Sequence, residues 1–202
     1  TDIINNRKTI INNELLKLDK YRLNHRHEII NKYINITDNY LEIGIENGYT
    51  FKSVLCNNKI GVDPSPSYIS DEVIKKTSDD FFKSNNKTFD IIFIDGMHQV
   101  EYVFRDFNNS INCLTKNGII FLDDIVPLNI NEQTKNPKEF FYEDDVLKYK
   151  NCAWTGDVWK FAYYLINKYM KKIEIEYFKS PHFRGVIKIE IKDKFNIPEE
   201  SI

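Results

Sequence analysis

Three aspartates and one histidine are the side chains of this chain that are most clearly able to bind a metal ion or to act in catalysis. Asp95 and His98 follow one apolar run of residues, and Asp123 and Asp124 follow the next one. If both runs are neighbouring parallel strands, their carboxyl ends place these side chains together beside the ligand crevice of the sheet. Three carboxylates that close repel one another unless a cation neutralises them. Their oxygen atoms suit magnesium, calcium or manganese better than zinc.

His98 lies three residues after Asp95, at the mouth of the same expected crevice. A histidine near its unperturbed pKa is a competent general base at neutral pH. The alternative is a histidine at a helix N-terminus that makes a single surface hydrogen bond. His25, His27 and His182 have no such company in the sequence, and we interpret them as structural.

A second set of residues has the spacing of a nucleotide-binding turn. A short apolar strand ends at Glu42 and runs through Gly44, Asn47 and Gly48 into the start of a helix. Glycine lets the backbone turn tightly and lets a ligand approach where a Cβ would clash. Such turns cradle nucleotide-like ligands in α/β proteins. A purely structural turn with two glycines is the alternative.

Polar residues also follow the next two expected strands. Asp63 lies about 20 residues after the glycine turn, where an α/β nucleotide site places a carboxylate for the ribose hydroxyls. The alternative is a surface turn, because Asp before Pro is common there. Ser78 and Asp79 could reach an adenine edge, or they could cap a helix that begins near Phe81.

Alternating strands and helices must position these residues. Between residues 39 and 124, short apolar runs alternate with helical patterns, which indicates a parallel sheet with helices on both faces. Residues 173–178 and 185–191 read as two strands with no room for a helix between them, so they must pair antiparallel. The other expected strands are 40–43, 59–62, 73–76, 89–94 and 118–122, and the expected helices are 8–35, 100–114 and one that begins after Asp157.

Composition narrows the class of protein further. The 202 residues suit one domain with a full core, since 42% are apolar and 14% aromatic. The net charge of −2 gives no support for a nucleic-acid partner, which usually requires a basic surplus. Three scattered cysteines fit a reducing compartment, so we expect a cytoplasmic protein. We find no apolar run of about 18 residues that would predict a membrane span, and no apolar signal-peptide core at the start.

The expected organisation is a single domain over residues 1–202. It divides into an N-terminal helical extension (1–38), a cofactor-binding half (39–124), a loop that could form a lid (125–153), and a C-terminal helix with a strand pair (154–202). A polar connection as long as residues 127–152 is usually functional or partly ordered in a compact domain.

Over residues 40–191 these features resemble the class I S-adenosylmethionine-dependent methyltransferases. Glu42-x-Gly44-x-x-x-Gly48 is similar to their motif I, in which a third glycine often stands where this chain has Glu46. The resemblance implies a Rossmann-like α/β fold, with a seven-stranded, mostly parallel sheet, an antiparallel C-terminal strand pair and helices on both faces. The cofactor contacts that it implies are Glu42, Gly44, Asn47, Gly48, Asp63, Ser78, Asp79 and Asp95.

Within that class, residues 94–98 (Ile-Asp-Gly-Met-His) and 156–160 (Gly-Asp-Val-Trp-Lys) are similar to small-molecule O-methyltransferases of the methyltransferase 24 group. This likeness implies methyl transfer to a hydroxyl of a sugar or a natural-product precursor, with His98 and Asp95 as catalytic residues. Asp95, Asp123 and Asp124 further resemble the magnesium site of catechol-type and macrolide-sugar O-methyltransferases.

Three other interpretations stay open at this stage. An NAD(P)-dependent oxidoreductase would also use Asp63, although the terminal strand pair and the glycine spacing disfavour it. A nucleic-acid methyltransferase is disfavoured by the charge. A domain that only binds the cofactor or a partner would leave His98 beside three acids unexplained. A homodimer is compatible with everything above.

Overall fold

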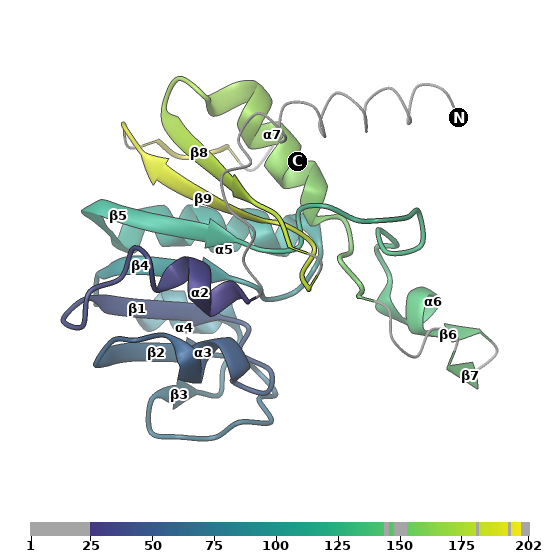
Figure 1. Cartoon of the computed structure of the whole chain (residues 1–202), viewed down its shortest axis with the longest axis horizontal. Helices are drawn as coiled ribbons and strands as arrows, with labels where there is room; N and C mark the ends of the chain where they lie inside the picture. Colours follow the sequence, from purple (N-terminus) through teal and green to yellow (C-terminus); the bar gives the residue numbers. More distant parts are fainter. Residues whose placement is uncertain (1–24, 144–145, 148–152, 181, 194, 199–202) are drawn as a thin grey trace.

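The computed structural model describes residues 25–143, 146–147, 153–180, 182–193 and 195–198. In this part of the chain, seven strands form one mixed sheet in the order β3-β2-β1-β4-β5-β9-β8 (Figure 1). The strands are β1 Asn39–Ile43, β2 Asn58–Val62, β3 Val73–Ile74, β4 Phe89–Ile94, β5 Leu114–Leu122, β8 Ile173–Phe178 and β9 Val186–Ile191. The first five are parallel to one another, whereas β9 runs antiparallel to both β5 and β8.

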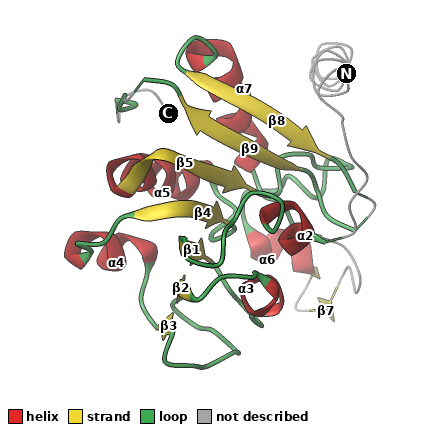
Figure 2. Cartoon of the chain, turned by 60° about the vertical axis from the view of Figure 1, so that its left-hand side comes forward, coloured by secondary structure: helices red, strands yellow, loops and turns green. Residues whose placement is uncertain are grey.

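Helices cover both faces of this sheet (Figure 2). On one face, α5 and α7 pack with the inward side chains of β1 and β4 into a large apolar core. On the other face, Ile29 and Ile30 of α2 and Phe51 of α3 form a second core with the alternate side chains of the same strands. The helices are α2 Arg26–Ile30, α3 Tyr49–Ser53, α4 Ser78–Ser84, α5 Val100–Cys113, α6 Pro137–Phe141 and α7 Val158–Tyr169.

The central strands explain where a ligand can bind. β1 and β4 are buried along almost their whole length because both of their faces are covered. β1 pairs with β2 on one side and with β4 on the other, so the strand order reverses between β1 and β4. In open α/β sheets, ligands bind outside the carboxyl ends of the strands at such a reversal.

The predicted fold class is confirmed, and most predicted elements match within two residues. β5 is longer than expected, because it already begins at Leu114, which pairs with Phe89 beyond a register shift. Of the helix expected over 8–35, only Arg26–Ile30 lies among the described residues as helix, and residues 1–24 lie outside them.

The segment expected to be a lid has some regular structure of its own. It contains α6 and a two-stranded sheet made of β6 Tyr142–Glu143 and β7 Val146–Leu147. These elements lie beyond the carboxyl ends of the parallel strands in Figure 1. None of the helices in the described part of the chain has the length and apolar character that crossing a bilayer requires.

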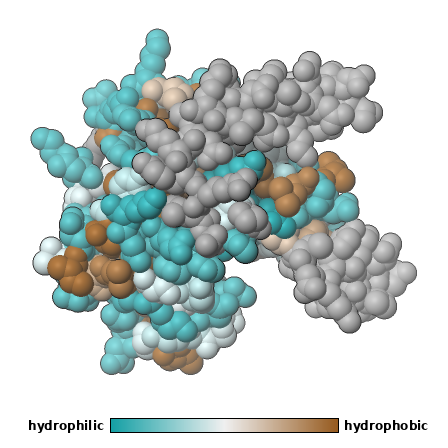
Figure 3. All heavy atoms as spheres, viewed as in Figure 1, coloured by the Kyte–Doolittle hydropathy of each residue, from teal (hydrophilic) through white to brown (hydrophobic). Residues whose placement is uncertain are grey.

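The surface of the face seen in Figure 3 is mainly hydrophilic, with separate hydrophobic patches. The large apolar side chains with the greatest exposure come from different loops of the chain, and they include Ile36, Leu55, Ile69, Leu128 and Ile130. Single apolar residues on a surface are normal and need no partner.

Candidate active site

A cavity of about 660 Å³ opens at the carboxyl edge of the sheet, at the reversal between β1 and β4. It combines the glycine turn after β1 with the acidic residues after β4 and β5. Its walls are formed by Arg26, Glu42, Gly44, Ile45, Glu46, Asn47, Tyr49, Thr50, Asp63, Asp95, Gly96, His98, Asp124, Ala153 and Trp154. Most of the predicted site residues therefore meet in one place.

The glycine turn is shaped by backbone conformations that favour glycine. Gly44 has φ +84°, and a Cβ there would collide with the carbonyl oxygen of Asp95, so only glycine lets β1 and β4 approach so closely at their ends. Gly48 has φ +69° and directly precedes α3. Glu46, which stands where motif I often has its third glycine, has φ +44°. The backbone thus keeps the glycine conformation although the residue is glutamate.

Asp63 and Asn47 hold this turn in place. The Oδ2 atom of Asp63 accepts hydrogen bonds from the backbone N–H groups of Ile45 (3.2 Å) and Glu46 (3.0 Å). The Oδ1 atom of Asn47 accepts from the N–H of Tyr49 at 2.9 Å. Both side chains also line the cavity. Since a carboxylate oxygen accepts more than one hydrogen bond, Asp63 can hold the turn and still bind a ligand hydroxyl.

Glu42 is buried at the floor of the cavity. The hydroxyl of Tyr40 donates to its Oε2 atom at 2.5 Å. Burial raises the pKa of Glu42 to about 8, although the Tyr40 hydrogen bond acts in the opposite direction. A cationic group of a ligand beside Glu42 would favour its ionised form.

His98 stands between two of the three predicted aspartates. Its Nε2 atom lies 3.4 Å from Oδ1 of Asp95 and 3.2 Å from Oδ2 of Asp124. Its Nδ1 atom lies 2.6 Å from the carbonyl oxygen of Trp154, so Nδ1 carries a proton and Nε2 faces the carboxylates. Burial alone would lower the pKa of His98, but the nearby charges of Asp124 and Asp95 outweigh it and raise the pKa to about 10. Without a ligand, His98 is therefore an imidazolium at neutral pH.

Arg26 supplies the second positive charge of this cluster. Its Nε atom donates to Oδ2 of Asp123, and the guanidinium lies 3.8 Å from the carboxylates of both Asp95 and Asp124. Although burial opposes it, these charges hold the pKa of Arg26 above its usual value. No sequence pattern marked Arg26, because only the packing of α2 on the sheet brings it to the ends of β4 and β5.

Asp123, which we predicted as a metal ligand with Asp95 and Asp124, has a different neighbour in the structure. Among the described residues, the acids and histidines close enough to share a cation are Asp95, His98 and Asp124, whose ligand atoms all lie within 4.8 Å of one another. Asp123 is absent from that group because its carboxylate points to Arg26. Asp124 has φ +56°, an uncommon backbone conformation that aspartate tolerates, and this turns successive carboxylates in different directions.

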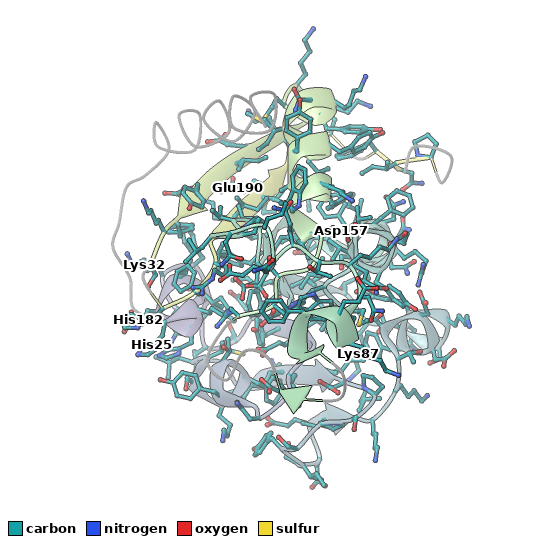
Figure 4. All side chains as sticks on the ribbon, turned by 90° about the vertical axis from the view of Figure 1, so that its right-hand side faces the viewer. His25, Lys32, Lys87, Asp157, His182 and Glu190 are labelled. Atoms are coloured by element: carbon teal, nitrogen blue, oxygen red, sulfur yellow. The ribbon has the colours of Figure 1, made fainter. Side chains whose placement is uncertain are left out.

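The Gly-Asp-Val-Trp-Lys segment supports the loop that carries His98. Gly156 has φ +53°, and a Cβ there would collide with the carbonyl oxygen of His98. The N–H of Asp157 donates to that carbonyl at 3.2 Å. The buried Asp157 carboxylate accepts from the N–H of Val100 at 2.8 Å and so caps the start of α5 (Figure 4). This segment therefore holds His98 without touching its ring.

Three predicted cofactor residues do not line the cavity. Gly48 does not line the cavity, whereas its neighbours Asn47 and Tyr49 do. Asp79 pairs with Arg105 at 3.2 Å, and Ser78 bonds to the buried carboxyl of Asp106. Their predicted contact with adenine stays a prediction. The alternative that Ser78 or Asp79 caps a helix beginning near Phe81 is wrong, because α4 already begins at Ser78 and its N-cap is Thr77, which accepts from the N–H of Asp80 at 3.2 Å.

The other three histidines lie close together, which the sequence did not indicate. The rings of His25 and His27 stack 5.4 Å apart, and the ring of His182 lies 6.1 Å from that of His25 (Figure 4). Tyr49, which lines the cavity, packs with its ring edge-on to both His25 and His27. Residues distant in sequence meet here because α2, α3 and the β8–β9 connection lie at the same edge.

The segment that forms most of the cavity is similar to a methyltransferase domain. Residues 41–125 match the family model Methyltransf_24, described as a methyltransferase domain. The matched segment runs from β1 to the end of the acidic cluster, and so it contains most of the cavity wall. This match covers less than half of the chain, and together with the fold it supports the interpretation of the chain as a methyltransferase.

Solved structures show the same fold. An O-methyltransferase from Bacillus cereus in complex with SAH has a TM-score of 0.55 and 14% identity, over 82% of this chain and 78% of that one. An rRNA methylase from Streptococcus thermophilus has a TM-score of 0.56 and 6% identity, over 83% and 94%. The MycE methyltransferase of the mycinamycin pathway, bound to Mg and SAH, has a TM-score of 0.52 and 18% identity, over 86% and 50%.

At these identities the likeness establishes the fold and no more. The three structures are named as different kinds of methyltransferase, so they do not indicate which acceptor this chain uses. A search of curated protein sequences found no match.

Proposed function

We propose that this protein transfers the methyl group of S-adenosylmethionine to a hydroxyl of a small molecule, such as a sugar or a natural-product precursor. The observation that carries the proposal is the position of His98, whose Nε2 atom lies between two carboxylates in the wall of the cavity that holds the glycine turn. A proton acceptor beside a methyl donor suits a hydroxyl nucleophile, which must lose its proton.

The residues of the cavity fit the donor. Glu42 and Asp63 lie in the same wall on either side of the glycine turn, with acceptor oxygens for an ammonium group and for ribose hydroxyls. The carboxylates of Asp95 and Asp124 add negative charge, which favours a cationic ligand. When bound, S-adenosylmethionine supplies a methyl group that is already activated as part of a sulfonium. The protein must then mainly align that group with the acceptor oxygen.

His98 can act as a base only when its pKa falls. A cationic ligand bound in the cavity would destabilise the imidazolium and would lower the pKa of His98 from about 10. The bond from Nδ1 to the Trp154 carbonyl keeps the free lone pair on Nε2, on the side of Asp95 and Asp124. His98 then accepts the hydroxyl proton at Nε2, and the two carboxylates stabilise the imidazolium that forms.

The predicted three-aspartate magnesium site fits the described residues poorly. Asp123 is bonded to Arg26, and the third donor near Asp95 and Asp124 is an imidazole nitrogen, whereas magnesium prefers an octahedron of oxygen atoms. We therefore route no step of the reaction through a metal ion.

Small acceptors are favoured over nucleic acids by the charge of the chain and of the cavity. The net charge is −2, and three aspartates lie at the site, which would repel phosphates. We propose that the acceptor binds on the side of Ala153 and Trp154, which line the cavity close to His98.

Two substitutions test the proposal with separate readouts. His98→Gln should keep the affinity for S-adenosylmethionine, measured by calorimetry, and lower kcat by about 100-fold or more, because a positioned base contributes that much. Asp63→Ala should weaken donor binding by about tenfold or more, because both its ligand contact and the bonds to the turn are lost. A thermal-shift panel with S-adenosylmethionine, SAH and NAD separates a methyltransferase from an oxidoreductase.

A screen for turnover, with sugars, nucleotide sugars and catechols as candidate acceptors, identifies a substrate on which kcat can be measured. Full turnover by His98→Gln on an accepted substrate would remove His98 from the mechanism. Stabilisation by NAD and not by S-adenosylmethionine would favour the oxidoreductase.

A further inference from the structure

We propose that Arg26 is the resident cation of the acidic site and that methyl transfer by this protein needs no divalent metal. In this role Arg26 is a positioning residue: its guanidinium holds Asp123 and Asp124, and Asp124 in turn holds His98. The turnover part of the inference rests on the proposed function, whereas the metal-binding part does not.

A side chain of the protein itself offsets part of the negative charge of the cluster. Arg26 lies within ion-pair distance of Asp95, Asp123 and Asp124, with its shortest contact to Asp123. His98 lies against Asp95 and Asp124 from the other side. Because a guanidinium keeps its proton at any relevant pH, the positive charge that Arg26 brings to the three carboxylates is permanent.

Packing holds Arg26 at this position. Ile29 and Ile30, about one helical turn further along α2, are fully buried under the sheet. The Asn31 side chain, which follows α2, donates to the Ser53 carbonyl at 3.0 Å and accepts from the Leu55 N–H at 2.9 Å, so the end of α2 is tied to α3.

The guanidinium itself is held from two sides. It lies 5.9 Å from the centroid of the Phe183 ring, and its Nε atom bonds to the fully buried carboxylate of Asp123. Asp123 is held in turn, since its backbone N–H donates to the carbonyl of Ile94 at 3.1 Å. Arg26 would have to leave both partners to make room at Asp123.

A divalent ion would have to compete with this arrangement. Binding to Asp123 requires breaking its bond to Arg26. Binding at Asp95, His98 and Asp124 alone would place a doubly charged ion close to the guanidinium of Arg26, which lies 3.8 Å from the carboxylates of Asp95 and Asp124. Like charges at such short range repel strongly in a partly buried site. The guanidinium of Arg26 therefore excludes a divalent metal ion from the three carboxylates.

The first experiment uses the unmodified protein. Isothermal titration calorimetry with Mg²⁺ and with Mn²⁺ should give no saturable binding at millimolar concentrations, and turnover should be unchanged after treatment with EDTA. Saturable binding that Asp124→Asn abolishes, or loss of turnover in EDTA that Mg²⁺ restores, would overturn the inference. The titration needs no acceptor, so it gives a result even if the proposed function fails.

The second experiment removes the cation. Arg26→Ala should bind Mn²⁺, because all three carboxylates become available, and its kcat should fall by at least about tenfold and rise again with Mn²⁺. A merely structural role for Arg26 would not create a metal site. Arg26→Lys, which keeps the charge, should recover part of the kcat without metal and should not bind Mn²⁺.

Lys192→Ala is the matched control. Lys192 forms an exposed ion pair with Glu174 at 3.5 Å. Glu174 belongs to β8, the outermost strand of the sheet, whereas the cavity lies at β1 and β4. The substitution should change neither kcat nor metal binding. If Arg26→Ala does not fold, the double substitution Arg26→Met with Asp123→Asn removes both partners of the ion pair, and it should fold without gaining Mn²⁺ affinity. A folded Arg26→Ala that neither binds Mn²⁺ nor loses turnover would contradict the assignment.

Discussion

Buried carboxyl groups around the cavity differ in their partners, and this decides their ionisation. Glu42 has Tyr40 as its hydrogen-bond donor, whereas Asp123 has the guanidinium of Arg26. Asp106 has only Ser78, and one of its carboxyl oxygens has no hydrogen-bond partner. Burial raises the pKa of Asp106 to about 7, so this side chain is the clearest case of a buried acid without a charged partner.

The pKa of Asp106 leads to a prediction about stability and pH. Because the folded protein holds the Asp106 proton more tightly than the unfolded chain, the contribution of Asp106 to the free energy of unfolding is highest in acid and falls as the pH rises from about 4 to about 7. The loss is roughly 4 kcal/mol. Asp106→Asn cannot ionise, so urea unfolding should show that its stability relative to the original protein increases by about that amount between about pH 4 and about pH 8.

Asp80→Asn is the control for this measurement. Asp80 is exposed, and the hydrogen bond from Lys83 lowers its pKa, so its substitution should change the pH dependence in the opposite direction. Equal pH profiles for Asp106→Asn and the original protein would show that Asp106 is ionised without cost.

Among the elements, the turn between β1 and α3 has the most constrained backbone. Glu46 keeps a positive φ because its N–H bonds to Asp63 and its carbonyl accepts from the N–H groups of Ser67 (2.8 Å) and Tyr68 (3.3 Å). These bonds hold the conformation whichever side chain is present. A residue other than glycine then carries strain of about 1 kcal/mol in this region.

Glu46→Gly should therefore stabilise the protein relative to Glu46→Ala by about 1 kcal/mol, although the greater flexibility of unfolded glycine offsets part of that gain. The two variants are matched, since both remove the carboxylate and only one relieves the strain. Urea unfolding of both measures the difference. A more stable alanine variant would mean that the positive φ of Glu46 carries no strain.

For the molecule as a whole, one buried ion pair connects the segments around the site. Arg184, at the β8–β9 connection, donates two hydrogen bonds to the carboxylate of Glu132, at 2.9 and 3.0 Å. The backbone carbonyl of Glu132 accepts from the N–H groups of Thr155 and Gly156, both at 3.0 Å. The segment after β5, the sheet edge and the support of His98 are thereby joined.

Glu132→Gln should destabilise the protein by about 3 kcal/mol, because it leaves a buried guanidinium without its counter-charge. Urea unfolding measures this loss. The double substitution Glu132→Gln with Arg184→Met should cost less than the sum of the two single changes, since the pair is removed together. Additive losses would mean that the two side chains stabilise the fold independently.

Most of the fold could be predicted because its causes are local. The apolar runs of β1 and β4, the stripe of α5 and the two final strands each show their periodicity in the sequence. Part of the site could be predicted in the same way, because Asp95, His98, Asp123 and Asp124 all follow strands whose ends must meet at one edge. The partners of these side chains could not, because a pattern of residue types does not say which way a carboxylate turns.

The sequence by itself determined the class of fold, the edge of the sheet at which the site lies and the set of acids there, since the alternation of strands and helices follows from short-range patterns. Only the tertiary structure decided how the acids are neutralised. Arg26 comes from a helix almost one hundred residues before Asp123, and its contact depends on how α2 packs over the sheet. A long-range contact of this kind has no local signal, and on it rests our proposal that a side chain of the protein takes the place of the expected magnesium ion.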